Sequence, residues 1–195
     1  MTITRRQFVT RSAATAAAVG MPTVASSRVW RANEEIRVGI VGLGGRGRDA
    51  HVPGFQNQPG VKVVAIADVD QQRLASTADM IQSKYGHQVE QFTDMRQMFD
   101  RKDIDVIGNA TQNYWHGLST IWACEAGKHV YVEKPLSHTV WEARELTRVA
   151  REKKVITQMG NQGHTHDGTR VLKEWVQAGV LGEVREIVSW TNRPF

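Results

Sequence analysis

The chain has 195 residues, 41% of them apolar, which is enough for one domain with a hydrophobic core and leaves little for a second. The formal charge of +5 does not describe the whole chain, because five of the 25 basic residues and none of the 20 acidic ones fall within residues 1–32. The remainder is balanced in charge, so we expect no nucleic-acid partner. A single cysteine, Cys124, excludes an internal disulfide.

Residues 1–32 have the composition of a cleavable export signal. A basic start is followed by a weakly apolar, alanine-rich run over 13–25, which is shorter than the roughly 20 residues that span a bilayer. The stretch TRRQFV (residues 4–9) resembles a twin-arginine signal, whose translocation machinery exports folded proteins. We therefore predict a periplasmic or otherwise extracytoplasmic protein with no stable membrane span after cleavage. The alternative is an amphipathic first helix that contains two arginines.

Beyond this segment, strand-like and helix-like stretches alternate. Strands are expected at 36–42, 61–68, 89–92, 104–111, 129–135 and 155–160. Helices are expected at 71–86, 116–128, 139–154 and 165–179, with a short helical stretch after residue 47 that Pro53 interrupts and another that Asp94 caps. Strands that are apolar on both faces and alternate with helices predict an α/β fold with a doubly wound parallel sheet.

A glycine motif follows the first expected strand. Gly42, Gly44 and Gly47 form a G-x-G-x-x-G pattern that opens a helix, where glycines permit a tight turn and let backbone N–H groups approach a pyrophosphate. Asp68 ends the next strand, 21 positions after Gly47. A carboxylate there can accept hydrogen bonds from both ribose hydroxyls of NAD and repels the 2′-phosphate of NADP. We predict NAD as the cofactor, with NADP less favoured. Arg46 could instead pair with a phosphate, and a glycine-rich turn without a dinucleotide is the alternative.

Polar side chains follow three of the later strands. They are Asn109, Thr111, Gln112, Asn113 and His116 after the fourth strand, Glu133 and Lys134 after the fifth, and Asn161, Gln162, His164 and His166 after the sixth. Open parallel sheets bind ligands at the carboxyl ends of their strands. The sequence therefore predicts that these groups converge on one edge of the sheet.

Five stretches together resemble the Gfo/Idh/MocA oxidoreductases, a family that includes glucose–fructose oxidoreductase and inositol dehydrogenase. They are VGIVGLGGRG, AIADVD, ATQNYWHG, GKHVYVEKPLSHTVWEA and QMGNQGH, and the resemblance runs from about Ile36 to the end of the chain. It implies a Rossmann dinucleotide-binding domain, a nicotinamide cofactor and a sugar, polyol or related hydroxyl substrate. The exported members of this family also carry twin-arginine signals.

The resemblance also assigns roles to residues. Lys134 is expected to assist proton transfer while hydride passes to or from the nicotinamide, and His164 is a further catalytic candidate as a substrate contact or relay. Glu133 would anchor polar groups near the nicotinamide or tune the lysine, and His116 would lie near the nicotinamide ribose. The cofactor-binding residues expected in full are Gly42, Gly44, Gly45, Arg46, Gly47, Asp68, Thr111, Gln112, Asn113, His116, Glu133, Lys134, Asn161 and Gln162.

The family resemblance further implies that the chain is the N-terminal portion of a longer protein. Relatives are roughly twice as long, carry a second, mostly antiparallel sheet domain and are expected to form homo-oligomers. The strict alternation over 182–193 predicts the first strand of that domain. We therefore divide the chain into a signal and linker (1–32), an NAD-binding domain (33–181) and the start of a truncated α+β substrate domain (182–195).

Three alternatives stay open at this point. Lys134 can be a surface lysine paired with Glu133. The protein can be an NAD-dependent glycosidase, which oxidises a sugar transiently, eliminates the leaving group and reduces again. It can also be a non-catalytic NAD-binding module. We expect no metal site, because His164 and His166 lie in one loop that supplies too few ligands.

Overall fold

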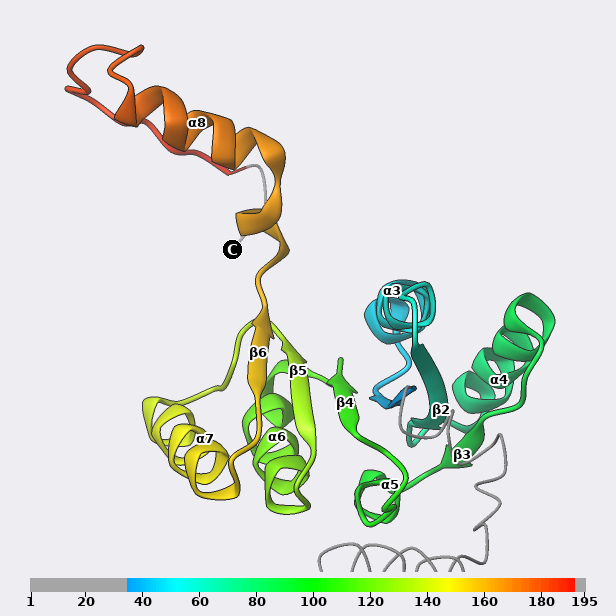
Figure 1. Ribbon diagram of the computed structural model, residues 1–195. Coiled ribbons are helices and arrows are strands. Elements are labelled where there is room, and N and C mark those ends of the chain that lie inside the picture. The colour runs from blue at the N-terminus through cyan, green and yellow to red at the C-terminus, as the bar shows by residue number, and fades with distance from the viewer. Residues whose placement is uncertain (1–34, 192–195) are drawn as a thin grey trace, which may run out of the picture.

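A computed structural model describes residues 35–191 and contains a six-stranded parallel sheet covered by helices (Figure 1). The strands are β1 (Ile36–Val41), β2 (Val61–Ala67), β3 (Glu90–Phe92), β4 (Val106–Asn109), β5 (His129–Glu133) and β6 (Thr157–Gly160). Their order in the sheet is β3-β2-β1-β4-β5-β6, and every neighbouring pair is parallel. This is the doubly wound order of a Rossmann sheet, so the predicted fold class is confirmed.

The helices begin and end close to where the sequence places them. They are the π-helical turn η1 (Gly47–His51), α3 (Val52–Gln56), α4 (Gln71–Tyr85), α5 (Met95–Phe99), η2 (Asn113–Trp115), α6 (His116–Glu125), α7 (Val140–Lys153), η3 (Gln162–Thr165) and α8 (Asp167–Gln177). Side-chain caps fix several starts. Asp94 accepts a hydrogen bond from the Arg96 N–H, as predicted. Thr139 and Glu142 form a reciprocal capping box at the start of α7.

The expected interruption at Pro53 is not found. The Val52 N–H donates to the Gly47 carbonyl five residues back, which makes a wide π turn, and Pro53 follows in the first turn of α3. A proline in the first turn of a helix lacks only an N–H that has no partner there. The helix therefore continues through the proline, with the wide turn just before it.

Apolar side chains fill both faces of the sheet. One core cluster joins Val130 and Val132 of β5 to residues of α5, α6 and α7. The other joins Val38 and Ile40 of β1 to residues of α3 and α4. With both faces of the central strands buried, polar groups are left to the strand ends, where the chain turns into loops.

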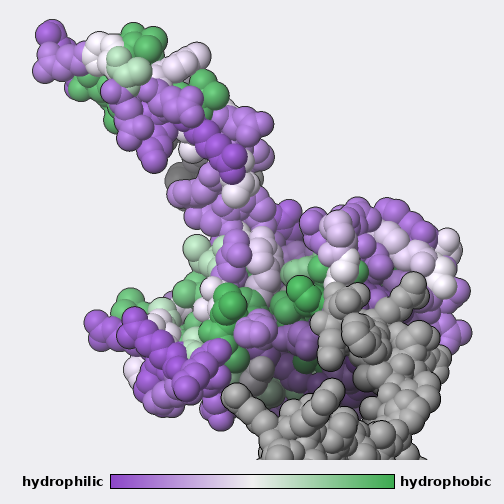
Figure 2. Space-filling model, viewed as in Figure 1, coloured by the Kyte–Doolittle hydropathy of each residue, from purple (hydrophilic) through white to green (hydrophobic). Residues whose placement is uncertain are grey.

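Residues after β6 leave the body of the sheet. Helix α8 and the segment that follows it project outward as an arm with exposed apolar side chains, and Figure 2 shows these among polar residues. No strand is assigned between residues 182 and 191, so within the described part of the chain the strand expected over 182–193 does not form. A single strand has no neighbour to take its backbone hydrogen bonds. The boundary of a second domain stays a prediction, and the predicted signal lies outside the described residues.

Between residues 35 and 191, no helix has the length and apolar character needed to cross a bilayer.

Two glycines test the packing of α3 on the sheet. A Cβ added to Gly108 in β4 would lie 2.7 Å from Ile40 Cδ1 and 2.9 Å from Phe55 Cε2, whereas one added to Gly54 in α3 meets nothing within 4 Å. We expect Gly108→Ala to lower the free energy of unfolding by about 1–3 kcal/mol. The control Gly54→Ala should raise it by about 0.5–1 kcal/mol, because alanine favours the helix. Urea denaturation measures both, and equal effects would contradict this packing.

Candidate active site

The glycine turn between β1 and η1 is set by close backbone contacts. Gly42 has φ +82°, and a Cβ there would lie 2.6 Å from the Ala110 carbonyl oxygen. A Cβ on Gly47 would lie 1.7 Å from the Gly42 carbonyl oxygen. Neither position admits a side chain, so these two glycines are required for the turn itself.

The helix that follows the turn begins with free donors. Its first bond runs from the Arg48 N–H to the Gly44 carbonyl at 2.9 Å. The N–H groups of Gly45 and Arg46, one turn earlier, have no carbonyl within the helix to bind. Such N–H groups, at the positive end of the helix dipole, suit a phosphate. The turn therefore fits the pyrophosphate of a dinucleotide.

Asp68 lies directly beside this turn. One of its carboxylate oxygens accepts the Leu43 N–H at 2.6 Å, and the other accepts the Asp70 N–H at 2.9 Å. A carboxylate oxygen has two lone pairs, so both oxygens keep the capacity to accept a ribose hydroxyl. Asp68 directly follows β2, and its carboxylate contacts the glycine turn through the Leu43 N–H. Its contact with a ribose stays a prediction.

Arg73 of α4 also reaches the turn, a contact that was not predicted from the sequence. Its Nη1 lies 3.4 Å from where a Cβ on Gly44 would be, and its Nε lies 3.3 Å from an oxygen of Asp70. A guanidinium is thus placed over the glycine turn on the side of β2. Arg73 lies in the first turn of the helix that follows Asp68, and this spacing is the feature of the sequence that could have indicated the contact.

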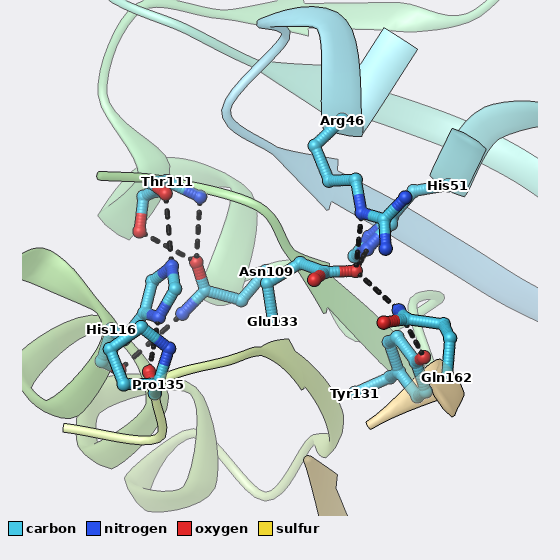
Figure 3. A network of polar contacts seen from close by, with 9 residues as sticks. All are labelled: Arg46, His51, Asn109, Thr111, His116, Tyr131, Glu133, Pro135 and Gln162. Atoms are coloured by element: carbon cyan, nitrogen blue, oxygen red, sulfur yellow. Dashed lines mark hydrogen bonds and ion pairs between the residues drawn. The ribbon is translucent and has the colours of Figure 1, made fainter. Parts of the chain in front are cut away.

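Three side chains converge on the Glu133 carboxylate at the end of β5 (Figure 3). Oxygen Oε1 lies 2.9 Å from His51 Nε2, 3.0 Å from Arg46 Nε and 2.9 Å from Gln162 Nε2. Glu133 and His51 are each only 5% exposed. The network joins the helix of the glycine turn, β5 and the start of η3 at one oxygen.

For both Glu133 and His51, burial and the neighbouring polar groups shift the pKa in opposite directions. Burial alone would raise the pKa of Glu133, but the hydrogen bond from His51, the charge of Arg46 and the hydrogen bond from Gln162 lower it below its ordinary value. Burial lowers the pKa of His51, and the hydrogen bond to Glu133 offsets only part of that effect. A neutral imidazole that donates to an ionised carboxylate accounts for both directions.

A second polar network lies at the end of β4 (Figure 3). The buried Asn109 amide donates to Ser119 Oγ at 2.7 Å and Thr120 Oγ1 at 3.1 Å. Its oxygen accepts the Thr111 hydroxyl at 2.8 Å and the Thr111 N–H at 3.2 Å. Asn109 therefore holds the loop after β4 against α6, a role that its place at the strand end only hinted at.

His116 lies inside this second network and not at its surface. One ring nitrogen faces the Pro135 carbonyl oxygen at 2.6 Å and the other faces the Thr111 carbonyl oxygen at 2.9 Å. The residue is 1% exposed. Both nitrogens are engaged by backbone, so His116 ties the loop after β4 to the loop after Lys134. Contact with a nicotinamide ribose through these nitrogens stays a prediction that the geometry does not favour.

The remaining predicted residues lie at the same edge with different degrees of contact. Lys134 is exposed, directly after Glu133, and its bond to Pro135 is cis. Gln162 joins the Glu133 network. The others are exposed around the edge, and they are Gln112, Asn113, Asn161, His164 and His166. Among residues 35–191, no group of three histidine, cysteine, aspartate or glutamate side chains is placed to hold a metal.

A cavity of about 550 Å³ adjoins the Glu133 network. Its walls include Arg46, His51, Phe55, Tyr131 and Gln162. His51 meets the rings of Phe55 and Tyr131 edge-on, with centroids 6.1 Å and 5.4 Å away. The apolar part of the wall thus encloses the imidazole and shields its bond to Glu133 from water.

Comparison with known proteins decides the family. A model of the Gfo/Idh/MocA family, described as an oxidoreductase family with an NAD-binding Rossmann fold, matches residues 36–161. The chain belongs to the Gfo/Idh/MocA oxidoreductases. The match begins at β1 and ends just after β6, so it covers the glycine turn, Asp68 and the Glu133-Lys134 strand end.

Curated and solved relatives agree with this assignment. The chain is 33% identical over 156 residues to a glycosyl hydrolase family 109 protein from Shewanella pealeana, which covers 77% of this chain and 34% of that protein. Among solved structures it is similar to myo-inositol 2-dehydrogenase from Lactobacillus plantarum, with 31% identity, a TM-score of 0.67 and coverage of 77% and 43% of the two chains. A 3-ketoreductase from Actinomadura kijaniata in complex with TDP-benzene and NADP gives 28% identity, a TM-score of 0.69 and coverage of 77% and 46%.

The present chain thus spans about a third of the length of the curated relatives it matches and less than half of the solved ones. In this member of the Gfo/Idh/MocA family, the described residues form the NAD-binding Rossmann part.

The lowered pKa of His51 predicts how stability depends on pH. In the unfolded chain the imidazole takes up a proton as pH falls through about 6.5, whereas in the folded protein it does so only at lower pH. Stability is therefore fully present above pH 6.5 and declines as pH falls below it. We expect His51→Gln, which cannot titrate, to reduce that decline between pH 7 and 5. Urea denaturation across this range is the measurement.

The exposed His166 provides the control for this experiment. His166→Gln should leave the pH dependence as it is in the unchanged protein. A decline that is the same in His51→Gln as in the unchanged protein would show that His51 is not the group responsible.

Proposed function

We propose that this chain is the cofactor-binding part of an NAD-dependent oxidoreductase that acts on a sugar, a polyol or a related hydroxyl compound. The observation that carries the proposal is the placement of Lys134. It follows directly on Glu133, whose carboxylate is bound by two side chains from the helix of the glycine turn. The lysine therefore emerges at the sheet edge where the family holds its cofactor.

The residues of this edge divide the work between binding and proton transfer. NAD, when bound, supplies the hydride acceptor. The N–H groups of Gly45 and Arg46 would bind the pyrophosphate, and Asp68 would accept hydrogen bonds from the hydroxyls of the adenine-side ribose. Lys134, as the neutral amine, would take the proton from the substrate hydroxyl while the carbon that bears it loses a hydride to the cofactor, and would return the proton in the reverse direction. His164, exposed after β6, is the proposed second contact to the substrate.

The placement of the arginines bears on the choice between NAD and NADP. Arg46 binds Glu133 at the end of β5, which β1 and β4 separate from β2 and Asp68. At about 4.8 Å per strand, the end of β5, where Glu133 holds this guanidinium, lies roughly 14 Å along the sheet from the end of β2. The guanidinium considered above as a partner of a 2′-phosphate is therefore engaged elsewhere. Arg73 lies nearer to the expected ribose position than Arg46 does. NAD is nevertheless proposed, because the carboxylate of Asp68 lies at the same place and would repel a 2′-phosphate.

A second candidate, an NAD-dependent glycosidase, is favoured by one observation. The curated relatives at 33% identity are glycosyl hydrolase family 109 proteins from Shewanella strains. A glycosidase of this kind needs NAD that stays bound and shows no net reduction over a turnover. A dehydrogenase accumulates NADH in proportion to the oxidised substrate. Incubation of the purified protein with free sugars and with aryl glycosides, followed by absorbance at the NADH band and at the aryl leaving group, separates the two.

The cellular setting belongs to the same proposal. Residues 1–32 would direct the folded protein, with its cofactor already bound, through the twin-arginine machinery to the periplasm. Because free NAD is scarce there, a tightly held and internally recycled cofactor fits both candidates. A longer form with its substrate domain is expected to be a homo-oligomer. Export of a reporter fused to residues 1–32, lost when Arg5 and Arg6 are both changed to lysine, tests the signal.

Asp68→Asn tests the cofactor preference. The amide oxygen still accepts the Leu43 N–H, so the glycine turn is kept, but the negative charge is removed. We expect NADH to bind at least about tenfold more weakly, since one hydrogen bond to a charged group is worth about 1.5–3 kcal/mol. NADPH should bind more tightly than it does to the unchanged protein. Fluorescence titration with each cofactor measures both, and an unchanged ratio of the two affinities would remove Asp68 as the selecting residue.

Lys134→Ala tests the reactive group. In this chain the variant should bind NADH as the unchanged protein does, because the lysine side chain is not part of the glycine turn. In a full-length relative the equivalent change should lower the rate of the redox step by at least about a hundredfold, a common contribution of a positioned acid or base. Lys153→Ala, on the exposed face of α7, is the matched control. Full activity without the lysine would refute its role.

A further inference from the structure

The π turn η1 places two donors on the same side of the helix. Arg46 and His51 are five positions apart, and in an α-helix residues five apart point roughly 140° away from one another. In a turn closed by a bond to the fifth residue back, as from Val52 to Gly47, each residue turns through a smaller angle, so such residues point to more nearly the same side. Both side chains can therefore reach the same oxygen of Glu133, and both do (Figure 3). Single π turns are frequent at functional sites.

His51 is buried in a way that packing alone does not explain. Its Nε2 faces Glu133, but its Nδ1 is buried without a hydrogen-bond partner in the described part of the chain. Nδ1 lies against β4, 3.2 Å from where a Cβ on Gly108 would be. A buried nitrogen with no partner is unfavourable, and a leucine would fill the space beside Phe55 and Tyr131 without it. What the imidazole adds is its bond to Glu133.

We propose that His51 is a positioning residue that, with Arg46, links occupancy of the glycine turn to the way Lys134 is held. The turn begins the helix that carries both donors, Glu133 accepts from both, and Lys134 is the next residue along the chain. A pyrophosphate at the turn draws on the half-exposed guanidinium of Arg46. His51, fixed among aromatic rings, then keeps Glu133 and the end of β5 in place. This rests on the proposed function in one respect, namely that the turn binds a dinucleotide.

The experiment uses ADP-ribose, which fills the pyrophosphate side and carries no nicotinamide to cover the lysine. The rate at which an amine-reactive ester acylates Lys134 is followed by mass spectrometry, with Lys173 on the exposed α8 as the internal reference. Saturating ADP-ribose should slow labelling of Lys134 by at least about fivefold, the lower range of coupling between linked sites. The slowing should persist in His51→Gln, whose amide can still donate to Glu133, and disappear in His51→Leu.

Each other outcome overturns the proposal in a distinguishable way. If ADP-ribose binds but labelling of Lys134 does not change, or changes equally in His51→Leu, the link is absent while the proposed function stands. If the unchanged protein binds no ADP-ribose, the proposed function falls and the link with it. If a thermal unfolding experiment shows that His51→Leu does not fold, the ring nitrogens of His51 are followed by NMR in the unchanged protein. Resonances that do not shift on addition of ADP-ribose would equally overturn it.

Discussion

The buried carboxylate of Glu133 is the interaction on which the rest of this edge depends. Removing an ionised group from water costs several kcal/mol unless partners replace the water. Here three donors from two other segments do so, namely Arg46 and His51 of the helix after the glycine turn and Gln162 of η3. Each segment is thereby fixed relative to β5, and the lysine that follows Glu133 is placed by contacts that neither of these segments could make alone.

The neighbouring strand uses the same physical device. At the end of β4, Asn109 replaces water with hydroxyl and backbone partners and so holds the loop that leads to α6. His116 then connects that loop to the carbonyl of Pro135, one residue beyond Lys134. The lysine is therefore bracketed by a polar network before it and another after it. The apolar clusters on both faces of the sheet stabilise the fold, and the two strand-end networks fix the positions of the loops on either side of Lys134.

Local patterns in the sequence were sufficient for much of this, and for physical reasons. Strands apolar on both faces, such as β5, and glycines that admit no Cβ, such as Gly42 and Gly47, are visible in the order of residues alone. The pairing of His51 with Glu133 is not, because the two residues are 82 positions apart and meet only through the sheet order and the π turn. Pro53 was expected to interrupt its helix, but the wide turn from Gly47 to Val52 accommodates the proline. The alternation after residue 182 is real, but a strand forms only where another strand can pair with it.

The proposed preference for NAD over NADP depends on the charges around the glycine turn. The two guanidiniums that flank the turn each have an acidic partner, Arg46 with Glu133 and Arg73 with Asp70. The pyrophosphate is then met chiefly by backbone N–H groups and the helix dipole, which act over the first turn only. Asp68, by contrast, is held by backbone N–H groups and not by a cation in the ion pairs described. Its charge remains uncompensated in those ion pairs, and the proposed preference for NAD over NADP rests on this carboxylate, which neither arginine pairs with.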